Sequence, residues 1–200
     1  YGAAGERCMA IAVAVPVGEE TADRLIDKLV PRIEKLKVGP YTAGNDVDYG
    51  PVVTAAAKEN ILRLVESGVE QGAKLVVDGR DFNLQGYEDG FFVGPHLFDN
   101  VTTDMDIYKK EIFGPVLVMT PFDTEAEAIA MANGTEFGLV AGVFTRDLAR
   151  AHRVANRLRA PSLSPSARSR CSWSAHSYRA PPVPFHGQSP ICRHPRTVWK

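Results

Sequence analysis

The sequence predicts an α/β fold: a mostly parallel sheet flanked by helices, followed by an irregular C-terminal tail. Segments with strand-like and helix-like patterns alternate between about residues 9 and 158, a rhythm typical of parallel βα units. The character of the sequence changes at about residue 160, where these patterns end. A chain of 200 residues that is 44% hydrophobic can bury a core of one domain.

The first predicted pair of elements is a strand and a helix. Residues 9–17 are small, β-branched and almost entirely apolar, as in a strand buried on both faces. Residues 19–36 are predicted to form a helix, in which Pro31 should cause a bend or a break. Apolar residues recur along it at the spacing of one helix face: Ala22, Leu25, Ile26, Leu29, Val30, Ile33 and Leu36.

A loop and a second helix follow. Residues 37–53 contain several glycines and prolines and are predicted to be a loop. Thr54 should cap a helix over about 54–71 that ends at Gly72. Its inward side chains are expected to be Ile61, Leu62, Val65 and Val69.

The remaining body continues the alternation of strands and helices. Residues 80–92 are polar and aromatic, which favours a loop or hairpin. The expected strands are 74–78, 91–98 with an interruption at Gly94-Pro95, 115–121 and 140–145. The expected helices are 104–111, 124–132 and 147–158.

Residues 161–200 form a tail of different composition. They contain seven of the fourteen prolines, eight serines, six basic residues and no acidic residue. Such a segment is typical of a disordered linker. A second interpretation is that these residues are translated out of frame, because codons for 158–164 can encode Ala-Gly-Thr-Val-Ser-Val in another frame. We therefore expect two parts, a domain over 1–160 and a tail over 161–200.

Composition narrows the possible partners. Without the tail, the body carries 17 basic and 24 acidic residues, which disfavours nucleic acid as a partner. No apolar run is long enough to cross a membrane. The three cysteines, Cys8, Cys171 and Cys192, lack the spacing of a metal site, and we expect reduced thiols.

Cys8 is the first candidate for chemistry. It follows a run of small residues, Gly2-Ala3-Ala4-Gly5, which would allow a loop to approach a substrate closely. A cysteine thiolate can attack an aldehyde, and neighbouring Arg7 could favour the thiolate. The alternative is a small buried hydrophobic residue, as most isolated cysteines are.

The segment Glu111-Ile112-Phe113-Gly114-Pro115 is the second candidate. Glu111 could accept hydrogen bonds from two ribose hydroxyls, and Phe113 could offer a face to a nicotinamide ring. The alternative is a glutamate at a helix end and a core phenylalanine. His96 and His152 are expected to be surface or partly buried residues of a helix or loop, not ligands.

Several segments together resemble the aldehyde dehydrogenase superfamily, and most closely its coenzyme-A-acylating methylmalonate-semialdehyde branch. The resemblance covers about residues 1–160. It is carried by Arg7-Cys8-Met9-Ala10, Lys37-Val38-Gly39-Pro40, Asp48-Tyr49-Gly50-Pro51, Val76-Val77-Asp78-Gly79, Leu97-Phe98-Asp99-Asn100-Val101 and 107–116. Residues 137–142 instead resemble the superfamily in general.

The resemblance implies a part of a catalytic domain in which Cys8 is the nucleophile and Glu111 and Phe113 position the nicotinamide ribose and ring of NAD. It implies oxidation of methylmalonate semialdehyde, acyl transfer to coenzyme A and release of propionyl-coenzyme A, a step of valine catabolism. It also implies a homo-oligomeric enzyme in the bacterial cytoplasm or the mitochondrial matrix. The nucleotide-binding domain and one oxyanion-stabilising asparagine of the superfamily are expected to lie outside this sequence.

Two other functions stay open. A hydrolytic aldehyde dehydrogenase would resolve the thioester with water in place of coenzyme A. Alternatively, the isolated chain would be a non-catalytic α/β fragment.

Overall fold

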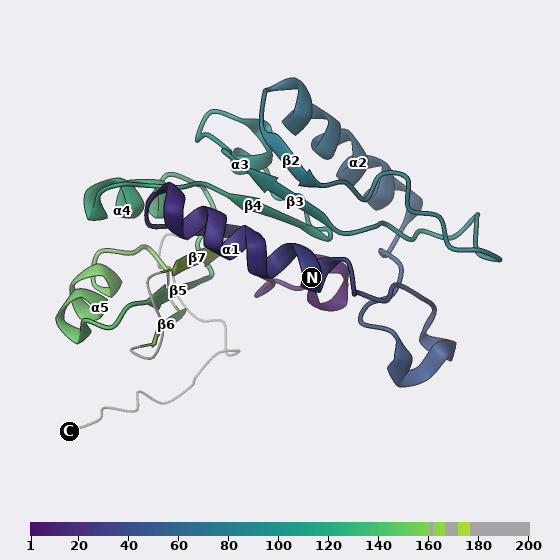
Figure 1. The fold of residues 1–200 in the computed structure, drawn as a ribbon, viewed down its shortest axis with the longest axis horizontal. Coiled ribbons are helices and arrows are strands. Elements are labelled where there is room, and N and C mark those ends of the chain that lie inside the picture. Colours follow the sequence, from purple (N-terminus) through teal and green to yellow (C-terminus); the bar gives the residue numbers. More distant parts are fainter. Residues whose placement is uncertain (161, 167–171, 177–200) are drawn as a thin grey trace, which may run out of the picture.

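The computed structural model describes residues 1–160, 162–166 and 172–176, with five helices, two short 3-10 helices and seven strands (Figure 1). The strands are β1 (Val13–Pro16), β2 (Lys74–Val77), β3 (His96–Asp99), β4 (Val116–Met119), β5 (Val140–Phe144), β6 (Ser162–Ser166) and β7 (Ser172–His176). The helices are η1 (Gly2–Gly5), α1 (Gly18–Ile33), η2 (Tyr41–Asp46), α2 (Ala55–Glu70), α3 (Asp106–Lys109), α4 (Glu125–Asn133) and α5 (Leu148–Ala155).

One sheet joins all seven strands in the order β2-β3-β4-β1-β7-β5-β6. The pairs β3–β4, β4–β1 and β5–β6 are parallel, whereas β2–β3, β1–β7 and β7–β5 are antiparallel. The α/β class is confirmed, and the sheet is more mixed than the expected parallel one. The antiparallel pairs come from β2 at the edge and from β7, which the sequence pattern did not reveal.

Strand β1, near the middle of the sheet, is buried on both faces, as the pattern of residues 9–17 predicted. Val13 and Val15 of β1 belong to a core cluster with Ile61 of α2, whereas Ala14 belongs to a second cluster with Ala22 of α1. Successive side chains of a strand point to opposite faces, so α1 and α2 cover opposite faces of the sheet. Figure 1 shows this arrangement, with α1 crossing in front of the sheet.

Helix α1 continues through Pro31 to Ile33, so the predicted break does not occur. Proline lacks the N–H that would donate to the carbonyl four residues earlier, so one helical bond is lost, only two residues before the helix ends. The bond that follows the helix, from Glu34 N to Val30 O at 3.0 Å, is still made.

Helix α2 begins as predicted, because the Thr54 side chain accepts a hydrogen bond from Ala57 N at 3.0 Å. Of the expected inward residues, Ile61 and Val65 are buried, and Val69 is 36% exposed. The buried face instead continues through Leu64 and Gly68. A Cβ on Gly68 would lie 2.8 Å from the side chain of Ile107, so this glycine allows α2 to approach α3 closely.

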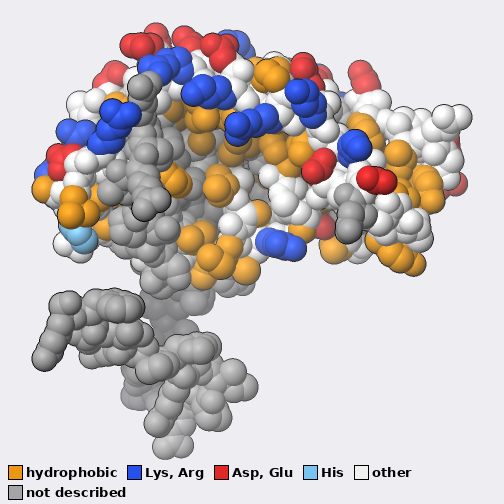
Figure 2. Space-filling view, turned by 60° about the horizontal axis from the view of Figure 1, so that its bottom comes forward, with side chains coloured by type: hydrophobic (Ala, Val, Ile, Leu, Met, Phe, Trp, Pro, Cys, Tyr) orange, Lys and Arg blue, Asp and Glu red, His pale blue; other side chains and the backbone are white. Residues whose placement is uncertain are grey.

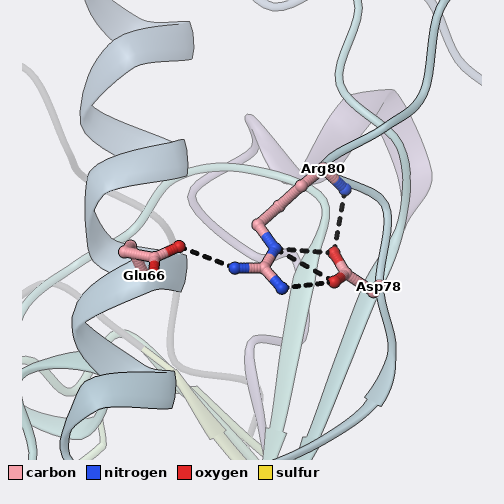
Figure 3. Close-up of polar contacts among 3 residues, drawn as sticks. All are labelled: Glu66, Asp78 and Arg80. Atoms are coloured by element: carbon pink, nitrogen blue, oxygen red, sulfur yellow. Dashed lines mark hydrogen bonds and ion pairs between the residues drawn. The ribbon is translucent and has the colours of Figure 1, made fainter.

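An ion cluster attaches α2 to the edge of the sheet (Figure 3). Arg80, just beyond β2, contacts Glu66 of α2 at 2.6 Å and binds both carboxylate oxygens of Asp78. The Arg80 hydrogen bonds lower the pKa of the Asp78 carboxyl below its usual value. Arg80 thus ties the end of β2 back to the preceding helix, 14 residues earlier in the sequence.

Two strands fall inside the segment predicted to be an irregular tail. β6 pairs parallel with β5, and β7 lies antiparallel between β1 and β5. Within the expected tail, the structure thus describes regular strands at 162–166 and 172–176, and the division of the chain at residue 160 stays a prediction. Backbone hydrogen bonds pair strands regardless of side-chain pattern, and composition could not reveal them. The rest of 161–200, including Cys171 and Cys192, lies outside the described residues.

His96 also departs from expectation. It is fully buried in β3, not at the surface or in a loop. β3 is covered on both faces, so its polar residue is enclosed together with its apolar neighbours. Burial lowers the pKa of His96 to about 4, against an opposing attraction from Asp78.

The described surface mixes both charge signs with apolar areas. Figure 2 shows acidic and basic side chains along one border of the molecule and hydrophobic side chains grouped beneath them. Among the helices that the structure describes, none has the length and apolar character to cross a membrane. Within the same residues, no three side chains of metal-binding type cluster together.

Candidate active site

The segment that carries Cys8 is a tight loop built by residues with unusual backbone angles. Ala3, Ala4 and Gly5 have φ values of 52°, 56° and 74°, in the left-handed region that glycine adopts readily and alanine only rarely. Ala10 N then donates to Arg7 O at 2.9 Å, which closes a turn around Cys8. The side chain of Cys8 is exposed and forms no disulfide, so the alternative of a buried structural cysteine is not what the structure shows.

Two contacts fix this loop to the body of the domain. Ala4 is buried in the main core cluster. The Glu6 carboxylate accepts a hydrogen bond from Val53 N at 3.2 Å, just before α2. Partial burial raises the pKa of Glu6, and the Val53 N–H opposes that rise.

The second candidate segment is the turn between α3 and β4. Phe113 has a φ of 56°, and its side chain is 41% exposed. Ile112 beneath it is buried. Phe113 is therefore not the core phenylalanine of the alternative interpretation, because the turn directs this ring away from the core.

The structure brings the two segments together. A Cβ on Gly5 would lie 1.9 Å from the carbonyl oxygen of Gly114, so the two backbones are in direct contact. Gly114 in turn lies against Ile61 of α2, whose Cδ1 would be 2.6 Å from a Cβ there. The cysteine loop and the turn of Glu111 and Phe113, a hundred residues apart in sequence, therefore lie against each other.

A small cavity of about 20 Å³ lies between the two segments, about the space of one water molecule. Its lining includes Arg7 and Ala10 from the loop and Glu111 and Phe113 from the turn. Cys8 does not line this cavity but lies exposed on the same loop. Arg7 is the cationic side chain among the described residues of this lining.

All three residues that the sequence singled out as site candidates, Cys8, Glu111 and Phe113, belong to these two adjoining segments. Sequence reasoning missed the contacts that Glu6 and Ile61 make with these segments. Glu6 stands only two residues before Cys8, which is the signal that could have drawn attention to it. The apolar spacing of α2 predicted that Ile61 faces inward, but its contact with Gly114 exists only in the folded chain.

The sequence of this chain also matches that of known proteins. A model of the aldehyde dehydrogenase family matches residues 1–168, which is most of the chain. The chain belongs to the aldehyde dehydrogenase family. The match extends past the boundary that we expected at residue 160.

Curated relatives in the family carry more specific names. The chain is 53% identical over 147 residues to a malonate-semialdehyde dehydrogenase of Pseudomonas aeruginosa, covering 74% of this chain and 29% of the relative. It is 48% identical over 155 residues to an acylating methylmalonate-semialdehyde dehydrogenase of Arabidopsis thaliana, covering 76% and 25%. The chain thus spans less than a third of the length of these relatives.

Solved structures give the same result for the fold. A putative methylmalonate-semialdehyde dehydrogenase of Sinorhizobium meliloti, complexed with NAD, has a TM-score of 0.78 at 57% identity, covering 82% of this chain and 33% of that one. The methylmalonate-semialdehyde dehydrogenase of Oceanimonas doudoroffii has a TM-score of 0.79 at 39% identity, covering 82% and 34%.

Proposed function

We propose that this chain is the nucleophile-bearing part of an NAD-dependent dehydrogenase that oxidises malonate or methylmalonate semialdehyde. The observation that supports this most strongly is the direct contact between Gly5 of the cysteine loop and Gly114 of the Phe113 turn. It joins a candidate thiol nucleophile to a candidate nicotinamide support. The names of the relatives from Pseudomonas and Arabidopsis support the choice of substrate.

Cys8 acts as the nucleophile in this proposal. Its thiolate sulfur forms a bond to the aldehyde carbon, and the carbonyl oxygen becomes the oxyanion of a thiohemiacetal. The backbone N–H of Cys8 itself is a donor suited to stabilise that oxyanion. The exposed side chain leaves the sulfur accessible to a small aldehyde.

The turn of Glu111 and Phe113 fits the nicotinamide end of NAD. Its exposed ring can face an aromatic ligand, and the close contact at Gly114 leaves no room for a Cβ beneath. Glu111 would accept hydrogen bonds from the ribose, and Phe113 would support the ring. When bound, NAD supplies an acceptor for the hydride that leaves the thiohemiacetal carbon as the thioester forms.

The position of Arg7 supports a semialdehyde that carries a carboxylate as the substrate. Malonate and methylmalonate semialdehydes carry a carboxylate, and Arg7 lies exposed next to Cys8 and lines the cavity. A guanidinium can bind a carboxylate with two parallel hydrogen bonds. We therefore assign Arg7 to the substrate carboxylate, with Arg7→Gln expected to raise KM at least tenfold for the semialdehyde and not for propionaldehyde.

Coenzyme A is the proposed acyl acceptor. Its thiol would attack the thioester carbon and release the Cys8 thiolate, and decarboxylation would yield propionyl-coenzyme A from the methylmalonate compound. The word "acylating" in the Arabidopsis relative's name supports this. Hydrolysis of the thioester by water is the second candidate, because the Pseudomonas relative's name does not mention acylation.

The relatives' names also suggest a compartment. The Arabidopsis relative is named mitochondrial, and the Pseudomonas one is not. We propose the mitochondrial matrix for a eukaryotic source and the cytoplasm for a bacterial one.

The test replaces the matching segment of the Sinorhizobium meliloti relative with this chain, which gives an enzyme of full length. NADH formation should require the semialdehyde and coenzyme A, and Cys8→Ala should abolish it while NAD still raises the melting temperature. The 200-residue chain alone should produce no NADH, because its sequence has no Gly-rich turn of the kind that binds the dinucleotide pyrophosphate. Full activity without Cys8 would refute the proposal, and activity without coenzyme A would favour hydrolysis.

A further inference from the structure

We propose that Glu6 is a positioning residue that fixes the Cys8 loop to the start of α2. The proposal rests on the proposed function only for the identity of Cys8 as the nucleophile. The main observation behind the proposal is the hydrogen bond from the backbone N–H of Val53 to the Glu6 Oε1 atom, at 3.2 Å.

Glu6 stands between the two turns of the loop. Its own N–H donates to Ala3 O at 3.0 Å, and the turn around Cys8 follows with the bond from Ala10 N to Arg7 O. The backbone bonds of Glu6 and Ala10 are local and hold the loop's shape. The side-chain bond of Glu6 reaches 47 residues along the chain and sets where that shape lies on the domain.

The position of Val53 explains why this anchor matters. Val53 directly precedes Thr54, the N-cap of α2, so Glu6 is joined to the beginning of that helix. About two turns further along α2, Ile61 lies against Gly114 in the turn that carries Phe113. One helix therefore holds both halves of the site, and Glu6 supplies the link to the half that contains Cys8.

The chemistry of Glu6 suits an anchor. A carboxylate that accepts from a backbone N–H forms a charge-assisted hydrogen bond, which is stronger than a neutral one. Glutamine would keep an acceptor oxygen at the same distance along the side chain, whereas alanine would remove it. The two variants thus separate the hydrogen bond from the charge.

Hydrogen exchange of backbone amides, measured on the 200-residue chain by NMR, tests the proposal. Glu6→Ala should speed exchange about tenfold at Val53, which loses its acceptor, and also at Ala10, which reports the turn around Cys8. Amides inside α2, such as that of Val65, should keep their rates. Glu6→Gln should restore the slow exchange at Ala10, a recovery that general loosening of the fold would not give.

A matched control and a second variant complete the test. Glu88 accepts a backbone N–H from Gly86 at 2.8 Å, so Glu88→Ala should speed exchange at Gly86 and leave Ala10 unchanged. Val53→Pro removes the donor while Glu6 stays intact, and it should reproduce the effect of Glu6→Ala at Ala10. Unchanged exchange at Ala10 in Glu6→Ala or in Val53→Pro overturns the proposal. So does a failure of Glu6→Gln to restore slow exchange at Ala10. These outcomes do not depend on whether the proposed oxidation of semialdehydes takes place.

Discussion

Gly5 carries two constraints at a single residue. Its φ of 74° is unfavourable for any side chain, and a Cβ would lie 1.9 Å from Gly114 O. An added methyl group at this position cannot be accommodated by rotating a neighbouring side chain, because the obstacle is backbone. The contact between the cysteine loop and the Phe113 turn thus depends on one hydrogen atom in place of a methyl group.

Gly5→Ala should lower the free energy of unfolding by about 1–3 kcal/mol, the range for a strained backbone position, as measured by urea denaturation. Gly2→Ala is the matched control in the same loop, because no atom lies within 4 Å of a Cβ at Gly2. The control should change stability by less than about 0.5 kcal/mol. Equal stability of the two variants would contradict the close contact.

The burial of His96 should make the free energy of unfolding depend on pH. Its pKa is about 4 in the folded chain and about 6.5 when unfolded, because burial disfavours the charged ring. Between these values the unfolded state binds a proton that the folded state does not. The free energy of unfolding therefore falls as the pH drops below about 6.5, and the loss is complete near pH 4.

Urea denaturation at pH 7 and pH 5 should show this loss as about 2 kcal/mol, from 1.36 kcal/mol for each pKa unit. His96→Leu should remove that part of the pH dependence. His152→Leu, which replaces an exposed histidine of α5, is the control and should respond to pH as the parent does. The same pH response in His96→Leu as in the parent would show that another group titrates.

At the scale of elements, α2 connects the core to the site. Ile61, Leu64 and Val65 bury its inner face, and the Arg80 cluster ties Glu66 on its outer side to the end of β2 (Figure 3). The start of the helix is fixed separately by the Thr54 cap. A change at that end should therefore affect stability without detaching the helix from the sheet.

Thr54→Ala should lower stability by about 1 kcal/mol, which corresponds to about 2–4 °C in melting temperature for a chain of this size. The reason is the loss of the hydrogen bond from Ala57 N to the Thr54 hydroxyl at 3.0 Å. Thr54→Ser keeps an acceptor and should melt within about 1 °C of the parent. If the serine variant were as unstable as the alanine variant, the lost methyl group and not the lost hydrogen bond would explain the destabilisation.

At the scale of the whole molecule, β7 determines whether the sheet is continuous. It lies between β1 and β5, and among the described strands no other pairing joins β5 to the rest of the sheet. Without β7, β1 would present an unpaired edge, which promotes association between chains.

A chain that ends at residue 160 should therefore elute from a sizing column as larger species and melt at a lower temperature than the parent. A chain that ends at residue 176 keeps β6 and β7 and should behave as the parent does. A monomeric, equally stable 160-residue chain would show that these strands contribute nothing to the fold.

The sequence was informative wherever the signal is local. The apolar spacing of 19–36 and the Thr54 cap predicted α1 and α2 to within a few residues, and Cys8, Glu111 and Phe113 could be singled out by residue chemistry. Signals were lacking where the structure depends on distant partners. β6 and β7 pair through their backbones, His96 is enclosed by both faces of the sheet, and the Gly5–Gly114 contact spans more than a hundred residues.

The position of β7 also bears on the order in which the chain is made. Strands β1 to β4 and helices α1 to α3 all lie within the first 119 residues, so that half of the sheet can assemble while synthesis continues. The pairing of Ala14 with Ser174 must wait until the last described strand has been synthesised. Until then the edge of β1 stays unpaired on the nascent chain, where a chaperone or a neighbouring chain can bind to it.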